Sequence, residues 1–277
     1  MAELWVEPSP RRDLFWGVGG RRLAPDPDVT YTVTDVKRTG FSRGYDVDGP
    51  DGREWSVKFP PEAPTEVVAS RILWAVGYHQ PPIYYLPRWT AEKAPLPNPQ
   101  EAARFREKKP DLHGLDATGQ WSYYENPFIG TVQLNGLVVL QVMLGNSDLK
   151  DDNNALYELS TPYERARRWY VARDLGQTFG RTGVLDAPRG EIEVFERTPF
   201  ITGVENGRVK FDWRGRHGAL LDSISPDDVR WICARLNRVS QRQWRDAFRA
   251  GSFPPEIADR FIRRLKQKIH EGLSLKG

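Results

Sequence analysis

Cysteine and histidine are scarce in this chain of 277 residues. The single cysteine, Cys233, excludes an intramolecular disulfide and a cysteine-rich metal site. Its neighbours in the sequence are apolar, which predicts a buried structural thiol. The four histidines are His79, His113, His217 and His270. None stands at metal-ligand spacing from another histidine or from the cysteine, so a catalytic zinc site is not expected.

Long apolar runs are also lacking. The longest, from Leu137 to Leu144, is far too short to span a bilayer. The N-terminus, Met-Ala-Glu-Leu-Trp-Val, has no apolar core of a signal peptide, so we expect a cytoplasmic protein if this end is native. If it is not native, the compartment stays open. An apolar content of 39% and a charged content of 28% are typical of soluble globular proteins.

Neither sign of charge dominates the chain. Forty Lys and Arg residues against 37 Asp and Glu residues leave a net charge of +3. This excess permits an anionic ligand but is too small to predict a nucleic-acid partner. Five arginines recur at three- or four-residue steps along predicted helices: Arg235, Arg238, Arg242, Arg245 and Arg249. We interpret them as a solvated helix face rather than as a phosphate site.

The first third of the chain is predicted to be rich in strands. Residues 1–28, with several prolines and a Gly-Val-Gly-Gly turn, read as an irregular N-terminal arm. Residues 29–90 read as one lobe. Within this lobe, strands are predicted over 30–36, 45–48, 54–59 and 83–86, and a helix over 65–76. Thr65 is the expected cap of that helix.

The remainder is predicted to be mainly helical. Residues 91–127 are rich in proline and charge, and we expect an insertion at a lobe junction with a short helix around 101–108. Residues 128–277 are expected to form a helical lobe. Its predicted elements are a buried helix over 131–144, strands over 155–159 and 168–173, and helices after Ser225, after Ser240 and over 254–272.

One motif carries chemistry. Asp148 follows the buried helix directly, Lys150 stands two residues later and Asn153 five residues later, and Asp174-Leu-Gly176 comes after the strand pair. Phosphoryl transfer needs a carboxylate to orient a hydroxyl, together with an amide and a carboxylate to hold magnesium. A calcium loop is a poor alternative, because the string lacks a glycine at its sixth position and a distal glutamate. A solvated turn after a helix is the plainer alternative.

In spacing and order, these residues resemble the catalytic loop and the metal-binding Asp-Phe-Gly turn of protein kinases, with Leu175 in place of phenylalanine. Gly145-Asn-Ser precedes Asp148 where ordinary kinases have His-Arg. The chain therefore resembles atypical branches of the protein-kinase-like superfamily: HipA-type toxin kinases, spore-coat and secretory-pathway kinases, and type II phosphoinositide kinases. The resemblance spans roughly residues 30–180. It implies an α+β fold of two lobes, and ATP with magnesium or manganese as cofactors.

The resemblance also assigns roles. Asp148 is the expected general base and Lys150 the group that neutralises the transferring phosphate. Asn153 and Asp174 are the expected metal ligands, and Gly176 permits a sharp exit from the metal-binding turn. A plain surface ion pair of Arg173 with Asp174 is the alternative for that turn.

A nucleotide site is predicted in the first lobe. Lys58 ends the third strand and is expected to contact phosphates while paired with Glu66 of the next helix, or with Glu62 as second choice. The segment from Gly40 to Gly44 is the candidate phosphate-covering loop, since backbone amides approach phosphates closely where side chains are absent. An edge-strand lysine and an ordinary β-turn are the alternatives.

The resemblance implies a phosphotransferase that moves the γ-phosphate of ATP to a hydroxyl. The acceptor stays open between a protein, a lipid headgroup and a small metabolite, because no sequence code specifies it. Two rival functions remain. One is an enzyme of the same fold that transfers AMP or phosphorylates a metabolite such as an inositol phosphate. The other is a non-catalytic, kinase-like nucleotide-binding module.

Overall fold

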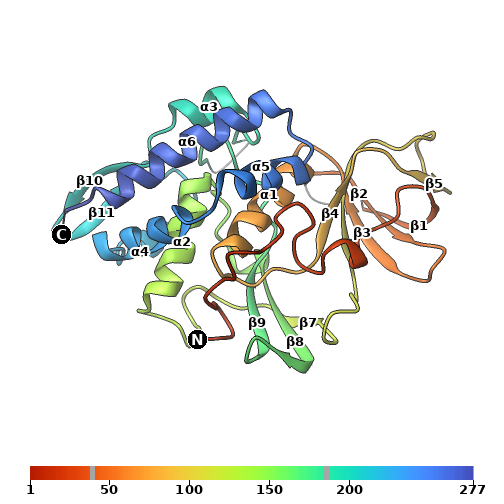
Figure 1. Ribbon diagram of the computed structural model, residues 1–277, viewed down its shortest axis with the longest axis horizontal. Coiled ribbons are helices and arrows are strands. Elements are labelled where there is room, and N and C mark those ends of the chain that lie inside the picture. The colour runs from red at the N-terminus through yellow and green to blue at the C-terminus, as the bar shows by residue number, and fades with distance from the viewer. Residues whose placement is uncertain (38–40, 184–186, 277) are drawn as a thin grey trace.

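The computed structural model describes residues 1–37, 41–183 and 187–276. It is a mixed α+β structure of two lobes (Figure 1). A curled β-sheet forms one lobe, and helices α2 to α6 gather mainly in the other. The expected two-lobed architecture is therefore confirmed. No helix in the described part of the chain is long and apolar enough to cross a membrane.

The first lobe is a six-stranded sheet in the order β4-β6-β3-β2-β1-β5. Its strands are β1 (Thr30–Lys37), β2 (Gly44–Asp48), β3 (Glu54–Lys58), β4 (Ile83–Leu86), β5 (Thr90–Glu92) and β6 (Ala103–Glu107). Neighbouring strands pair antiparallel except β1 and β5, which are parallel. Helix α1 (Glu62–Ala75) follows β3 directly, so the end of β3 and the start of α1 lie close together.

The expectation for residues 91–127 is wrong in part. Where a helix was predicted around 101–108, the chain forms β6, which lies between β3 and β4 within the sheet. Ala103 and Phe105 are fully buried in the core of this lobe, and the residues between and after them are charged. That alternation is a strand pattern. The sheet of the first lobe therefore extends beyond residue 90.

Helix α1 begins one turn earlier than predicted, at Glu62, and Pro61 occupies the cap position. Thr65 is therefore no cap. Thr65 lies within the first turn of α1, and its side chain is fully buried. Its hydroxyl donates hydrogen bonds to the carbonyls of Glu62 and Gly176. A residue expected at the helix end instead connects α1 to the second lobe.

The two faces of the six-stranded sheet differ in chemistry. Residues directly opposite each other on paired strands share a face, so Tyr45, Val57 and Phe105 lie on one side and Lys58 and Arg104 on the other. The first group is buried in an apolar core. The second face carries charged and polar side chains, and it is the face that meets the second lobe.

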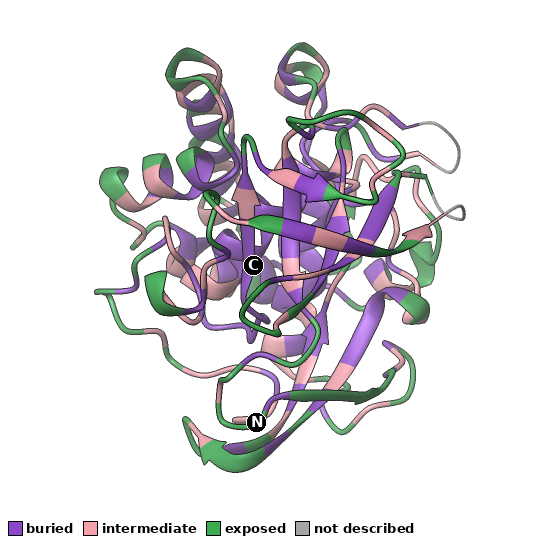
Figure 2. Ribbon diagram, turned by 90° about the vertical axis from the view of Figure 1, so that its right-hand side faces the viewer, coloured by how far each residue is buried: buried purple, intermediate pink, exposed green. Residues whose placement is uncertain are grey.

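The second lobe is built around α2 (Val132–Leu144), which is apolar on nearly every side and capped by Thr131. Its other elements are the three-stranded sheet β7 (Asp116–Gly119), β8 (Asn154–Tyr163) and β9 (Ala166–Ala172), the hairpin β10 (Ile201–Glu205) and β11 (Arg208–Phe211), and helices α3 (Ile192–Arg197), α4 (Pro226–Leu236), α5 (Gln241–Ala250) and α6 (Pro255–Leu273). Helices α4 and α5 begin after Ser225 and Ser240, as predicted, and both serines belong to capping boxes. Figure 2 shows buried segments through the middle of the molecule and exposed residues on outer turns and helix faces.

A buried lysine supports the end of α2. The amino group of Lys268, on α6, donates a 2.9 Å hydrogen bond to the carbonyl of Met143 in the last turn of α2 and lies 3.9 Å from the ring centroid of Phe195. The side chain is almost fully buried. Burial lowers the pKa of Lys268 to about 7. A cation is stabilised by the carbonyl end of a helix, so this contact helps to place the loop that follows α2.

This buried lysine predicts a pH-dependent stability. Because burial lowers the pKa of Lys268 to about 7, the unfolded chain binds more protons between that pH and the ordinary lysine pKa near 10. The contribution of Lys268 to the unfolding free energy therefore rises with pH, by at most about 1.4 kcal/mol per pH unit. Urea unfolding between pH 7 and 9 should show a smaller rise for Lys268→Met than for the native chain. The exposed Lys266→Met, on the same helix, is the matched control. Parallel curves for the native chain and Lys268→Met would contradict the assignment.

Candidate functional site

Lys58 stands at the end of β3 with three carboxylates around it. Its amino group lies 3.0 Å from Glu66 Oε2 and 3.5 Å from Glu62 Oε2, and it forms an ion pair with Asp174 of the second lobe. Both carboxylates considered from the sequence, Glu66 and Glu62, are therefore in ion-pair contact. Burial alone would lower the pKa of Lys58, but Glu66 and Asp174 outweigh it and raise the pKa above its ordinary value. The amino group is held as a cation.

Glu66 is the buried centre of this cluster. Only 2% of the residue is exposed, and besides Lys58 it meets Arg104 at 3.3 Å and Arg106 at 3.8 Å. Burial raises the pKa of Glu66, but Arg104 and Lys58 more than reverse this and lower it. Arg104 also donates to the carbonyl of Ser56. Both arginines belong to β6, and the sequence interpretation missed them because it placed them in a helix.

Asp174 carries its carboxylate into the same space from the second lobe. It follows β9 in a left-handed conformation, with φ of 58°, and such positions in non-glycine residues gather at functional sites. Burial raises the pKa of Asp174, but Lys58 outweighs this effect and the pKa falls to about 2. The carboxylate is therefore ionised at neutral pH, and about half of the side chain is exposed.

Gly176 was predicted to permit a sharp exit from the metal-binding turn, but the structure shows that it is needed for close packing. The left-handed residue of the turn is Asp174, whereas Gly176 allows close contact with α1. A Cβ atom on Gly176 would lie 2.5 Å from the Cβ of Glu62, and the Gly176 carbonyl accepts the 2.7 Å hydrogen bond from Thr65. The metal-turn candidate is therefore packed directly against the helix that carries Glu66.

The loop after α2 is held by buried amides. Gly145 ends the helix in a left-handed conformation, and the side chain of Asn146 then donates to Gln141 Oε1 at 2.9 Å. The Asn146 Oδ1 atom accepts a 3.2 Å hydrogen bond from the backbone N–H of Asp148. Asn146 is 1% exposed. It fixes the backbone at Asp148, and only its place in the motif, just before the aspartate, signalled this role.

The structure brings together the loop residues that the sequence singled out. Asn153 Nδ2 donates two hydrogen bonds of 2.9 Å to Asp148, one to its carbonyl oxygen and one to Oδ2. Lys150 Nζ lies 3.2 Å from the same Oδ2. Because the amide nitrogen of Asn153 is turned toward Asp148, its Oδ1 is the atom left to bind a cation.

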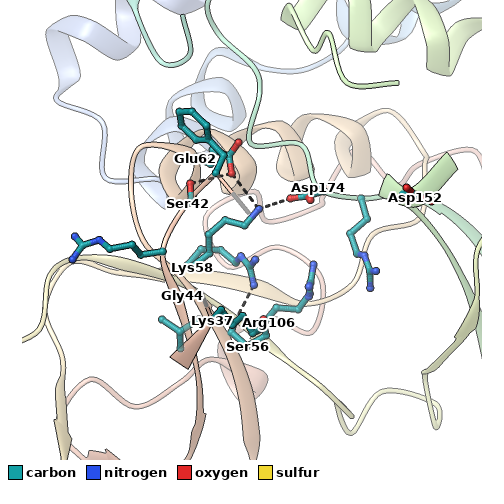
Figure 3. Close-up of a pocket in the computed structure, with 14 residues that line it drawn as sticks. Lys37, Ser42, Gly44, Ser56, Lys58, Glu62, Arg106, Asp152 and Asp174 are labelled. Atoms are coloured by element: carbon teal, nitrogen blue, oxygen red, sulfur yellow. Dashed lines mark hydrogen bonds and ion pairs between the residues drawn. The ribbon is translucent and has the colours of Figure 1, made fainter. Parts of the chain in front are cut away.

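A cleft of about 220 Å³ lies between the two lobes (Figure 3). Of the predicted site residues, Lys58, Gly44 and Asp174 line it, together with Glu62, the second choice of partner for Lys58. Glu66 lies buried behind Lys58, and Asp148, Lys150 and Asn153 do not contribute to this lining. A Cβ atom on Gly44 would meet the carbonyl of Val57 at 2.5 Å, so strand packing itself requires glycine there. The candidate Gly40 lies outside the described residues.

The cleft also contains charged residues that the sequence interpretation did not predict. Its described lining has six cationic side chains against three carboxylates. The cations are Lys37, Arg43, Lys58, Arg104, Arg106 and Arg173, and the carboxylates are Glu62, Asp152 and Asp174. A cleft with this balance attracts anions.

Residues around Glu62 close one side of the cleft. Arg189, from the segment after Gly176, pairs with Glu62 Oε1 at 2.6 Å, and Ser42 donates to Glu62 Oε2 at 3.0 Å. The guanidinium of Arg189 lies 3.6 Å from the ring centroid of Phe41. The candidate phosphate-covering loop is therefore in contact with both α1 and the second lobe.

The available oxygens fit a magnesium ion in part. Magnesium takes oxygen ligands and is commonly held by one or two protein side chains with water and phosphate completing its shell. The Oδ1 of Asn153 and the ionised carboxylate of Asp174 are such donors. Within the described residues there is no cluster of three or more His, Cys, Asp or Glu side chains that would form a complete protein cage. The two residues therefore offer the type of oxygen that magnesium takes beside water and phosphate.

The arginine stripe on the C-terminal helices is compensated by carboxylates. Arg235 and Arg238 face Glu7, Arg245 pairs with Asp259, and Arg242 and Arg249 pair with Asp246. Except for Arg235, these side chains are more than half exposed. The interpretation as a solvated face holds for four of the five arginines, whereas Arg235 packs over the ring of Trp231.

No protein-family model and no curated protein matches this chain. Among solved structures, it is similar to the crystal structure of a Helicobacter pylori proinflammatory kinase, CtkA. The two share 12% sequence identity with a TM-score of 0.50, and the superposition covers 90% of this chain and 100% of that chain. At this identity the similarity shows the fold alone, which is a two-lobed kinase-like fold.

The buried position of Glu66 predicts a large stability effect. Glu66→Gln removes the charge that compensates Arg104 and Lys58, and breaking a buried pair in this way costs about 3 kcal/mol or more. Glu101→Gln removes the carboxylate of an exposed pair with Arg43 and should cost less than about 1 kcal/mol. Urea denaturation of the two variants measures both values. Equal losses would show that the buried cluster does not stabilise the fold.

Proposed function

We propose that this protein is an atypical kinase, a phosphotransferase that uses ATP and magnesium. One observation carries the proposal: Lys58, oriented by the buried Glu66, meets Asp174 across the cleft. In the same lobe as Asp174, Asn153 is hydrogen bonded to Asp148. These residues follow one another in the order that phosphoryl transfer in kinases requires, and the kinase-like fold is consistent with it.

Each residue then has a distinct task. Lys58 contacts the phosphates of the nucleotide, and the Glu66 carboxylate keeps it charged and in place. Asn153, through Oδ1, and Asp174, through a carboxylate oxygen, would hold the metal. When bound, magnesium neutralises charge on the phosphate oxygens and orients them. Asp174 contacts Lys58 directly, so the two groups that would meet the metal and the phosphates lie next to each other.

Asp148 acts on the acceptor. It accepts the hydroxyl proton as the hydroxyl oxygen forms a bond to the γ-phosphorus, while the bond from that phosphorus to the bridging oxygen breaks and ADP leaves. Lys150, 3.2 Å from Asp148 Oδ2, is close enough to the base to neutralise charge on the transferring group. The acceptor is a hydroxyl of a protein, a lipid headgroup or a small metabolite.

The assigned roles predict that binding and chemistry separate by mutation. ATP with magnesium should raise the melting temperature of the native chain, because a ligand that binds only the folded state stabilises it by about 2.7 kcal/mol at a hundredfold excess over Kd. Lys58→Met and Asp174→Asn should reduce that shift, whereas Asp148→Asn should retain it and lose transfer activity. Arg245→Gln, on the compensated stripe, is the control. No shift with the native chain would count against the kinase proposal, and equal loss in all three variants would show that Asp148 is misassigned.

The donor group is tested with labelled ATP. Transfer of the γ-phosphate places the γ-phosphorus beside Asp148 and Lys150, whereas AMP transfer requires the reversed nucleotide with its α-phosphorus there. Both orientations use the same charges. We expect label at the γ-position, and not at the α-position, to enter an acceptor or the protein itself. Incorporation from the α-position alone would replace the kinase proposal with the AMP-transferring rival.

A further inference from the structure

The face of the six-stranded sheet that lines the cleft, here called the roof of the cleft, is polar. A nucleotide base would need an apolar surface there. Cross-strand register places Asp46, Ser56 and Arg106 opposite one another on β2, β3 and β6, on the face turned to the cleft. Lys58 and Arg104 form the next row of the same face. Figure 3 shows Ser56, Lys58 and Arg106 on these neighbouring strands. Sites for organic cofactors are usually lined mainly by apolar and aromatic side chains.

An ion network covers part of this roof. Lys37 at the end of β1 pairs with Asp46 at 2.7 Å and donates to the hydroxyl of Ser56 at 2.9 Å. Lys108 pairs with the same Asp46 at 3.1 Å. Two strongly hydrated lysines joined through one carboxylate offer a purine neither a flat apolar surface nor an aromatic ring. Among the described lining residues, Phe41 and Val57 are the apolar ones, and Val57 is buried in the core on the other face of the sheet.

Within the described residues, two arginines of the cleft have no carboxylate closer than 3.8 Å in an ion pair. Arg106, in the roof, has Glu66 at 3.8 Å as its carboxylate contact within the described residues. Arg173, from the second lobe, donates to the hydroxyl of Tyr157 and forms no ion pair there. The guanidinium group binds phosphate oxygens in a bidentate manner. The two lobes therefore each contribute an arginine without a short ion pair, among the described residues, to the lining of the same cavity.

We propose that the cleft recognises its donor through the polyphosphate chain and not through the base. Arg106 from the first lobe and Arg173 from the second lobe bind phosphate oxygens next to Lys58. The base contributes little to the affinity. The ligand class is a linear polyphosphate with or without a nucleoside. This inference rests on the proposed function, since it concerns the donor of the same reaction.

The experiment compares ATP, CTP and inorganic tripolyphosphate, each with magnesium, by isothermal titration calorimetry on the full chain. We expect the three dissociation constants to lie within about fivefold of one another, because bases that make few contacts add little binding free energy. We also expect all three affinities to fall in parallel with rising salt, since the attraction is electrostatic. A preference of more than about fiftyfold for ATP over both other ligands would overturn the inference and leave the kinase proposal standing. Failure of all three to bind would overturn both.

Variants test the two arginines. Arg106→Gln and Arg173→Gln should each weaken ATP, CTP and tripolyphosphate alike, by about tenfold, as expected for a lost charge-assisted hydrogen bond. Arg245→Gln changes the net charge equally but lies on the compensated stripe, so it should change none of the affinities. Arg173 is part-buried and lies outside the Glu66 cluster, so it keeps the test valid if Arg106→Gln does not fold. A variant that folds and weakens ATP alone would show that the arginine serves the nucleoside and would overturn the inference.

Discussion

The structure depends on one buried carboxylate, that of Glu66. Removing an ion from water costs several kcal/mol, so a buried carboxylate is stable only if cations surround it. Here the cations come from β3 and β6, through Lys58 and Arg104, while Glu66 itself belongs to α1. One charge therefore fixes the helix relative to two strands of the sheet. The same charge orients the lysine that faces the cleft.

The second lobe is joined to this cluster by short polar contacts. Asp174 pairs with Lys58, the Thr65 hydroxyl reaches the carbonyl of Gly176, and Arg189 pairs with Glu62. All three contacts involve α1 or the end of β3. A motion of α1 relative to the second lobe would therefore disturb the contact between Lys58 and Asp174. The loop that carries Asp148 is supported separately, from within its own lobe, through Asn146 and Gln141.

Local patterns predicted most helices and strands and singled out residues that lie together on the loop after α2. Alternation predicted β1, turn signals and short β-prone runs predicted β2 to β4, and the residues at the helix starts predicted α4 and α5. The spacing of Asp148, Lys150 and Asn153 placed them on one loop. The helix predicted around 101–108 is wrong, because the buried Ala103 and Phe105 alternate with charged residues and this period of two is that of a strand. A central strand with charged residues on one face is stable only if those charges find partners. The partners, Glu66 above all, lie on other elements.

The sequence by itself determined the kinase-like order of motifs, the two-lobed α+β architecture and the pairing of Lys58 with a helix carboxylate. The order of motifs follows from local spacing, whereas the two lobes and the pairing of Lys58 are what the resemblance to the kinase-like superfamily implies. Tertiary structure alone decided that the cleft is cationic, that Gly176 serves close packing on Glu62, and that Arg106 and Arg173 share one cavity. The reason is that electrostatic environment depends on which charges from distant segments converge. Strand order and lobe packing set that convergence, and no local pattern encodes it.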